Sequence, residues 1–315
     1  MQPTIYIPNL DGSSRLARLL ESLEGQTRPC DAVVVDNGSR DGSVAMTRER
    51  FPWVEVLELD RNLGFGRALN LAIAERPGDP ILLVNNDVEC EPGFVAAMLA
   101  ALQPGIEMVA GVLTQRASPS TVDSAGVVAD RRTLMAFDYL HGRPVTEVAT
   151  APPPLAPTGG AALYRREAFE EVGGFDERIF AYYEDLDLAL RLRAGGARCA
   201  LAPEARASHS YSATLGSRSG NKYALTGWSR GYLLRRYGVM ADPRGAARTA
   251  LCELAICAGQ VFMDRTTRGI GGRLRGWRDA AGLPRRPLPA ASLTEVSLGA
   301  SLTRRLRRRR DSAPG

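Results

Sequence analysis

Cysteine and histidine are both scarce in this sequence of 315 residues, which contains five cysteines and two histidines. The cysteines are odd in number and scattered along the chain, and none of their spacings is that of a zinc site. This distribution argues against a zinc-stapled fold and favours a reduced, cytosolic compartment. The five are Cys30, Cys90, Cys199, Cys252 and Cys257.

Signals for export or membrane insertion are also missing. The first ten residues, MQPTIYIPNL, lack the basic segment and long apolar stretch of a signal peptide. The apolar run within residues 241–263 is interrupted by Glu253, and we predict that it is too short and too charged at its edges to span a membrane. The composition, 44% hydrophobic and 24% charged, is that of a soluble globular protein.

The net charge of +5 is unevenly distributed along the chain. Residues 265–315 contain 13 arginines and 3 acidic residues, a net charge of +10, which leaves −5 for residues 1–264. Such a basic tail indicates contact with nucleic acid or with an anionic membrane surface, and the alternative is a solvated, disordered end. Its last arginines are Arg304, Arg305, Arg307, Arg308, Arg309 and Arg310.

The first hundred residues alternate strand and helix signals, a pattern that predicts a mostly parallel sheet. Four strands are expected, at Thr4–Pro8, Ala32–Val35, Val54–Leu59 and Ile81–Val84. The helices between and after them are expected at Ser13–Glu24, at 43–51, around Leu69–Ile73 and from Pro92 onward. After Gly111 the pattern loosens, and the later elements expected are an extended connector at 151–157, a glycine turn and strand in TGGAALYRR, and a helix at Tyr183–Ala194.

A polar cluster ends the apolar strand in ILLVNNDVEC, residues 81–90. Asn85, Asn86 and Asp87 follow directly on Val84. Ligands bind at the carboxyl ends of strands in open α/β sheets, so the location indicates a site. Asn and Asp also close turns by bonding their own backbone, so on this segment alone a plain turn is an equal alternative.

Similar clusters follow the first two strands, as PNLDG and DNGS, and a fourth, YEDLD, opens the helix near residue 184. Together the motifs VVVDNGSRDGS, NLGFGRALN, LLVNNDVE, TGGA and EDLDLALRLRAGG resemble, in order, the inverting nucleotide-sugar glycosyltransferases of the family-2 type. The resemblance covers roughly Thr4 to Gly238.

The resemblance implies an α/β fold of the GT-A class, Rossmann-like with a mostly parallel central sheet. Residues 1–240 are expected to form the catalytic domain, with a donor half at about 1–112 and an acceptor half at about 113–240. Residues 241–315 are expected to form a helical, basic extension with a disordered end.

The resemblance implies a donor site at the first strand ends. Asp36 is placed to accept the N3–H of uracil or thymine, although SRDG alone makes a turn-capping aspartate an alternative reading. Asn9 and Asp11 would line the same pocket. The full donor-binding set is Pro8, Asn9, Asp11, Asp36, Asn37, Asn62, Gly64, Arg67, Asn85 and Asn86.

The resemblance also implies a divalent cation, Mg²⁺ or Mn²⁺, on the donor diphosphate. This sequence departs from the family's Asp-x-Asp element, because Asn85 replaces the first acid and only Asp87 remains. One carboxylate with phosphate oxygens is a normal ligand set for these cations. His209 matches a histidine that the family can add, and a purely structural histidine is the alternative.

Inversion requires a general base, and we expect Asp185 to fill this role with Glu184 binding the acceptor or orienting the base. The helix N-terminus is expected to keep Asp185 ionised. Asp187 is expected to pair with Arg191, four residues along the helix. Without the other motifs, these acids would be read as simple complements of the helix dipole.

The acceptor is expected to meet the backbone at Thr158, Gly159 and Gly160, where a plain turn is the alternative. Asn221 and Arg218 lie where the family folds a segment over the diphosphate.

The Gln-x-x-Arg-Trp element of processive synthases is missing, so transfer of one or a few sugars is expected. Rhamnosyltransferases of cell-wall and surface-polysaccharide assembly share the motif pattern, and they indicate a UDP- or dTDP-sugar donor and a saccharide or lipid-linked acceptor.

Three other functions share parts of this pattern. A dinucleotide dehydrogenase is excluded because G-x-G-x-x-G is absent after the first strand. A sugar nucleotidyltransferase stays an alternative, although PNLDGSSR is a poor phosphate loop. A non-catalytic nucleotide-sugar or RNA-binding module also stays an alternative, although Asp87 and Asp185 are intact.

A lipid-linked acceptor favours an anionic membrane over nucleic acid as the partner of the basic tail. We therefore expect a cytoplasmic enzyme, peripheral at the inner face of the membrane, with its oligomeric state open.

Overall fold

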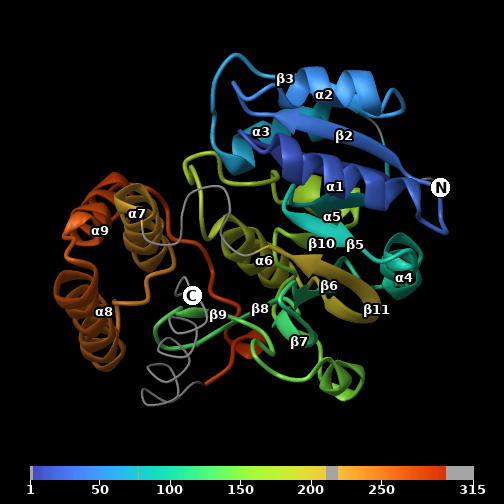
Figure 1. The fold of residues 1–315 in the computed structure, drawn as a ribbon. Coiled ribbons are helices and arrows are strands. Elements are labelled where there is room, and N and C mark those ends of the chain that lie inside the picture. Colours follow the sequence, from blue (N-terminus) through green and yellow to red (C-terminus); the bar gives the residue numbers. More distant parts are fainter. Residues whose placement is uncertain (1–2, 77, 211–218, 296–315) are drawn as a thin grey trace. The chain divides into compact units, whose positions relative to one another are not determined.

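The computed structural model describes residues 3–76, 78–210 and 219–295. The chain divides into two compact units (Figure 1). The first unit consists of Met1–Val127, Asp138–Phe180 and Glu184–Thr214, and the second consists of Val128–Phe137, Ala181–Tyr183 and Leu215–Gly315.

A nine-stranded sheet forms the centre of the first unit. Its order is β3-β2-β1-β4-β10-β6-β11-β5, with β7 paired to β6 off this path. The strands are β1 (Thr4–Asn9), β2 (Asp31–Asp36), β3 (Glu55–Glu58), β4 (Ile81–Val84), β5 (Val88–Cys90), β6 (Met108–Gln115), β7 (Ser118–Ser124), β10 (Ala161–Tyr164) and β11 (Cys199–His209). The helices of this unit are α1 (Ser13–Glu24), α2 (Ser43–Arg50), α3 (Phe65–Glu75), α4 (Phe94–Ala101), η1 (Val145–Thr150), α5 (Arg166–Glu171) and α6 (Glu184–Ala194).

The expected strand–helix alternation is confirmed in the first hundred residues. β1 pairs in parallel with β2 and β4, and β2 pairs in parallel with β3, so the carboxyl ends of these strands lie at one edge. The leucine face of α1 is buried as its helical spacing predicts, at Leu16, Leu19, Leu20 and Leu23. Pro92 lies in the turn before α4, which begins at Phe94.

The later part of the sheet is mixed in direction. β10 lies antiparallel between β4 and β6, whereas β11 is parallel to β6 and antiparallel to β5. The β5–β11 register pairs His209 with Val88, which places His209 beside the end of β4. Strands β6 and β7, in the stretch where the sequence pattern loosens, were not predicted. The predicted class, an α/β fold with a mostly parallel Rossmann-like region, is confirmed.

Three helices dominate the second unit: α7 (Gly220–Arg236), α8 (Pro243–Asp264) and α9 (Arg268–Asp279). The short elements β8 (Val127–Ala129), β9 (Ala136–Asp138) and η2 (Ala290–Ser292) complete the assignment. Helices α7 and α9 approach so closely that a Cβ on Gly276 would lie 1.9 Å from the carbonyl oxygen of Trp228. The predicted domain boundary at residue 240 therefore differs from the compact units, because α7 packs on α9 within the second unit.

The prediction that the apolar run in α8 is too short and too charged to span a membrane is wrong. Residues Gly245–Asp264 form a helix that is long and apolar enough, by length and composition, to cross one. Glu253 lies within this run, and its carboxylate accepts hydrogen bonds from Arg230 Nε (2.7 Å) and Arg273 Nε (2.6 Å) inside the unit. Burial raises the pKa of Glu253, but the two guanidinium groups outweigh it and lower the pKa to about 2.

Candidate functional site

Three polar residues from three strand ends form one hydrogen-bonded chain at the edge of the sheet. Asn86 Nδ2, after β4, donates to Asn9 Oδ1 at 2.7 Å, and Asn9 Nδ2, at the end of β1, donates to Asp36 Oδ1 at 2.9 Å. All three side chains are buried. Gly12 is required beside them, because a Cβ there would lie 2.3 Å from Asn86 Nδ2. The structure thus brings together residues that the sequence assigned to the donor.

Asp36 lines a polar hollow of about 320 Å³. Its second oxygen, Oδ2, accepts the backbone N–H of Ser39 at 2.9 Å, so the carboxylate is held in one orientation. A carboxylate oxygen has two lone pairs, which leaves acceptor capacity for a further N–H donor. The other residues that line the hollow are Gly38, Ser39, Arg40, Glu58, Leu59 and Asp60. Of these, Arg40, Glu58, Leu59 and Asp60 were not singled out from the sequence.

The remaining predicted donor residues make local structural contacts. Asp11 Oδ1 accepts the backbone N–H of Arg40 at 2.8 Å. Asn37 joins the loop after β3, since it accepts from Leu63 N at 2.7 Å and donates to Gly64 O at 3.2 Å. Asn62 caps the same loop by accepting from Gly64 N at 2.9 Å. Arg67 and Glu177 form an exposed ion pair at 3.6 Å, and Pro8 lies within β1.

Asp87 and His209 face each other although they lie on different elements. His209 Nε2 is 3.5 Å from Asp87 Oδ1, too long for a well-formed hydrogen bond. The backbone N–H of Ser210 donates to the carbonyl oxygen of Asp87 at 3.0 Å, which fixes the two chain segments together. The two side chains are 10% and 16% exposed, so both are largely withdrawn from solvent.

The residues at this position fit a hard divalent cation. Among the residues that the structure describes, none donates a hydrogen bond to the buried Asn85 Oδ1 or Asp87 Oδ1, nor to Glu184 Oε2 at the start of α6. Mg²⁺ and Mn²⁺ prefer such oxygen ligands. Within the described residues no group of three or more His, Cys, Asp or Glu side chains surrounds one point. A cation at Asp87 and His209 therefore needs further oxygens from a ligand, as a diphosphate supplies.

The sequence did not identify Asp123, which contacts both histidines of the chain. His209 Nδ1 lies 2.6 Å from Asp123 Oδ2, and His141 Nδ1 lies 2.7 Å from the carbonyl oxygen of Asp123. Burial lowers the pKa of His209, but its carboxylate neighbours Asp123 and Asp87 outweigh this and raise it to about 10. Burial raises the pKa of Asp123, but hydrogen bonds and charges of the two histidines hold it well below its usual value.

The acids Glu184 and Asp185 open helix α6. Burial, with the neighbouring Asp185, raises the pKa of Glu184 to about 8. Burial also raises the pKa of Asp185, although backbone N–H groups of Leu186 and Gly159 oppose the shift. The predicted stabilisation of the Asp185 anion by backbone N–H groups at the helix N-terminus is present, but burial opposes it and raises the pKa on balance. Asp185 nevertheless has the better anion site, since Leu186 N donates to it at 2.7 Å whereas Glu184 Oε2 has no donor.

Asp187 has the predicted structural role. Its Oδ2 lies 2.8 Å from Arg191 Nε on the next turn, and its side chain is fully buried. The segment Thr158–Gly160 lies beside the two acids: Gly159 is hydrogen-bonded to Asp185, and a Cβ on Gly160 would be 3.6 Å from Asn85 Nδ2.

Two further residues, Asn221 and Arg218, were predicted to cover the diphosphate. Asn221 belongs to the second unit, at the start of α7, where its Oδ1 accepts from Arg268 Nη1 at 3.0 Å. Arg218 lies outside the described residues, as do the tail arginines 304–310 and the end that was expected to be disordered.

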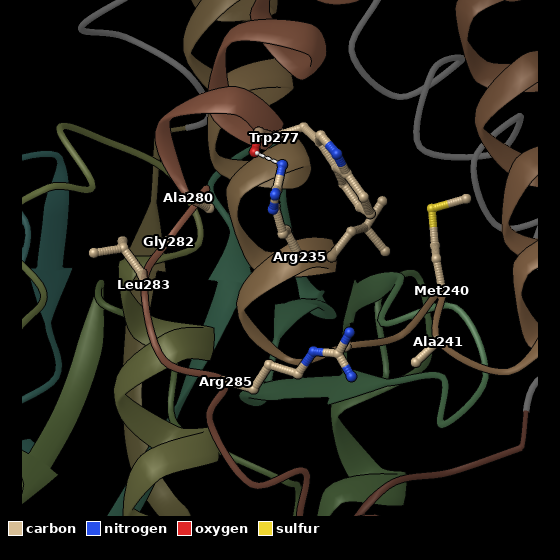
Figure 2. A pocket seen from close by; sticks show the side chains of 10 residues that line it. Arg235, Met240, Ala241, Trp277, Ala280, Gly282, Leu283 and Arg285 are labelled. Carbon is tan, nitrogen blue, oxygen red and sulfur yellow. Dashed lines mark hydrogen bonds between the residues drawn. The ribbon is translucent and has the colours of Figure 1, made fainter.

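The second unit has a hollow of its own, of about 330 Å³ (Figure 2). Arg235 extends along the face of Trp277, with its guanidinium carbon 5.4 Å from the ring centroid, and Arg285 projects into the same space. None of the residues that the sequence predicted for the site lines this hollow.

The fold and the strand-end site define the class of this protein: a nucleotide-sugar glycosyltransferase with the GT-A fold. Residues 4–173 match the model of the family described as glycosyl transferase family 2, and the chain belongs to that family.

The relatives and neighbours agree with this assignment. The chain is 32% identical over 223 residues, 62% of its length and 71% of the relative's, to the N-acetylglucosaminyl-diphospho-decaprenol L-rhamnosyltransferase of Mycobacterium tuberculosis. Among solved structures, the mannosyltransferase PcManGT from Pyrobaculum calidifontis, in complex with GDP-Man and Mn²⁺, has a TM-score of 0.53 and 18% identity. That alignment covers 92% of this chain and 77% of the mannosyltransferase. GalNAc-T7 with UDP, GalNAc and Mn²⁺ has a TM-score of 0.58 and 15% identity, and the alignment covers 78% of this chain and 51% of GalNAc-T7. The resemblance to family-2 glycosyltransferases is confirmed.

Proposed function

We propose that this chain is an inverting, metal-dependent and non-processive glycosyltransferase. It moves a sugar from a UDP- or dTDP-sugar to a hydroxyl of a saccharide or lipid-linked acceptor in cell-wall or surface-polysaccharide synthesis. dTDP-rhamnose is the leading donor, because the 32% identical relative is named as an L-rhamnosyltransferase that acts on a lipid-linked sugar. The observation that carries the proposal is the Asp87–His209 pair with the donor-free oxygen of Asn85, joined to the acids of α6 through Gly159 and Gly160.

The strand-end residues would bind the donor. Asp36, fixed by Asn9 and Ser39, would accept the N3–H of the base in the 320 Å³ hollow. Asp87 and His209 would hold Mg²⁺ or Mn²⁺ together with the diphosphate. The cation would supply charge neutralisation for the departing diphosphate. The other donor residues proposed are Pro8, Asp11, Asn37, Asn62, Gly64, Arg67, Asn85 and Asn86.

Asp185 would be the general base and Glu184 its partner. We assign the anion of this buried pair to Asp185, which accepts the N–H of Leu186 at 2.7 Å, and the proton to Glu184, whose pKa burial raises to about 8. The ionised Asp185 then takes the proton of the acceptor hydroxyl as that oxygen attacks the anomeric carbon. Thr158, Gly159 and Gly160 would contact the acceptor, and hydrogen bonding from Gly159 to Asp185 would couple this segment to the base.

We also propose that the enzyme is cytoplasmic and peripheral at the inner face of the membrane. Support comes from α8, where Leu251, Leu254 and Phe262 form an exposed stripe, 61%, 66% and 82% accessible. Exposed arginines on α9 accompany this stripe, and the basic tail follows in the sequence. They are Arg268, Arg275 and Arg278. Residues 1–240 as the catalytic domain and 241–315 as the membrane-directed extension remain part of this proposal.

The test is a transfer assay with UDP-glucose, UDP-GlcNAc, UDP-galactose and dTDP-rhamnose, each with Mn²⁺, Mg²⁺ or EDTA. Saccharide acceptors on a short lipid diphosphate are offered, and the product's anomeric configuration is read by NMR. Cation-dependent formation of an inverted glycoside from one donor is expected. Release of pyrophosphate from a nucleoside triphosphate and a sugar phosphate would instead identify a nucleotidyltransferase. Binding of the donor without any transfer or hydrolysis would identify a non-catalytic module.

A further inference from the structure

We propose that Asp123 is a positioning residue that fixes the imidazole of His209 so that Nε2 faces Asp87. This inference rests on the proposed function, because it assumes that Asp87 and His209 hold the cation of the donor complex. Asp123 is remote from both in the sequence and was not singled out by any motif.

The backbone directs Asp123 toward the site. In the β6–β7 pairing, Leu113 is opposite Ser124 and Thr114 is opposite Val122, so Asp123 is the extra residue of a β-bulge. A bulge changes the direction of a side chain and occurs frequently beside active sites. Its carboxylate is carried into the interior, where Asp123 is 7% exposed. A charged group is buried in this way only with strong partners.

The hydrogen bond between Asp123 and His209 selects one ring orientation. Asp123 Oδ2 lies 2.6 Å from Nδ1 of His209, and an ionised carboxylate can only accept. Nδ1 of His209 therefore carries a proton, and Nε2 is the nitrogen that faces Asp87 Oδ1 at 3.5 Å and that would give up its proton to bind a cation. A carboxylate behind a metal-binding histidine orients the ring and raises the basicity of its free nitrogen.

His141 holds the opposite side of Asp123. Its Nδ1 is 2.7 Å from the carbonyl oxygen of Asp123 and 3.5 Å from Oδ1. His141 thus contacts Asp123, whereas His209 contacts both Asp123 and Asp87. This division of contacts gives His209 the proposed ligand role and His141 a supporting role.

The small number of histidines makes the geometry directly measurable. Tag-free protein with ¹⁵N-labelled imidazoles has only two rings to observe, and H141Q assigns them. Long-range ¹H–¹⁵N spectra with UDP and diamagnetic Mg²⁺ are expected to show Nδ1 of His209 protonated and Nε2 shifted by the cation. D123N is expected to lose this pattern and to populate the other tautomer. An unchanged His209 tautomer in D123N would overturn the inference.

Cation affinity provides the second measurement. Mn²⁺ binding with UDP, followed by EPR, is expected to weaken about 10- to 100-fold in D123N and D123A, the range for loss of such outer partners. H141Q is the matched control, because it removes a contact to Asp123 but leaves the Asp123–His209 pair; its affinity should stay closer to wild type. Thermal unfolding in EDTA identifies variants that do not fold, and D123N retains the shape of the side chain if D123A fails.

The outcomes separate this inference from the proposed function. If H209A loses Mn²⁺ while D123N binds it as wild type does, the positioning role is rejected and the metal site stands. An equal loss in D123N and H141Q would assign Asp123 a general structural role and would also reject the inference. If wild-type protein with UDP binds no Mn²⁺, the proposed metal dependence itself fails.

Discussion

Asn86 donates a hydrogen bond of 2.7 Å to Asn9, although 77 residues separate them in the chain. The bond joins the end of β4 to the end of β1. Asn9 in turn donates a hydrogen bond to Asp36 at the end of β2. Removing one member of a buried pair leaves its partner's polar atom unsatisfied, at a cost of about 1–3 kcal/mol.

N86A should therefore lower the free energy of unfolding by about that amount and weaken UDP or dTDP binding, because Asp36 loses part of its support. Urea denaturation and calorimetric titration measure the two effects. E49A, at an exposed position of α2, is the control and should leave the free energy of unfolding nearly unchanged. Equal destabilisation by both substitutions would contradict a special role for the buried chain.

Asp87 should be required for cation-dependent binding. D87A is expected to abolish the stabilisation that Mn²⁺ or Mg²⁺ with a nucleoside diphosphate gives to the protein in thermal unfolding. The reason is that His209 alone leaves the cation without a protein carboxylate. D79A, an acid elsewhere in the same unit, controls for a general loss of charge. Persistence of the full cation effect in D87A would show that the cation is held elsewhere.

Asp185 should be required for turnover but not for donor binding. D185N keeps the shape of the side chain and removes the proton acceptor, so the rate of transfer should fall about 10²- to 10⁴-fold. Donor affinity should stay within a few-fold of wild type, because the donor residues lie at other strand ends. Single-turnover kinetics and titration with a non-hydrolysable donor measure the two. Near-normal turnover in D185N would reject Asp185 as the base.

Glu184 should give the protein a distinct pH dependence. The pKa of this carboxyl rises from 4.5 to about 8 on folding. Between these values the folded state retains a proton that the unfolded state has released, so the free energy of unfolding falls as pH rises through this window. E184Q cannot titrate and should lose this slope, whereas E167Q, at an exposed position of α5, should keep it. Urea denaturation at several pH values is the measurement, and parallel curves for wild type and E184Q would contradict the prediction.

Membrane attachment should depend on the α8 stripe as well as on the tail. Truncation after Asp264 would remove α9 from its packing on α7, so point substitutions are the cleaner test. L251D with F262D, and separately deletion of residues 296–315, should each reduce co-sedimentation with anionic vesicles. High salt should reduce it further in the stripe variant, because arginine contacts are screened. L71D, at a partly exposed leucine of α3, is the control. Binding that neither change reduces would reject the proposed surface.

The donor half of the fold could be predicted because its signals are local. The spacing of Leu16, Leu19, Leu20 and Leu23 gives α1, and the apolar run Ile81–Val84 gives β4. The polar clusters after β1, β2 and β4 could be assigned to one edge because parallel strands end together.

The missed features depend on pairings between distant segments. β7 has the sequence SPSTVDS, which lacks the alternation of a half-buried strand, and its bulge at Asp123 arises only from its register with β6. The ionic environment of Glu253 likewise requires Arg230 and Arg273, which lie on two other helices. The sequence therefore indicates that Glu253 interrupts the apolar run, whereas in the folded unit the two arginines compensate its charge.

The pairing of β11 with β5 and β6 also determines the order in which the parts of the site become available during synthesis. A ribosome releases the chain from its amino terminus, so the first four strands and the Asn86–Asn9–Asp36 chain are available long before residue 209 appears. The residues of the proposed nucleotide side are thus synthesised before the histidine of the proposed cation site. That site can be completed only when β11 adds to the sheet and places His209 opposite Asp87.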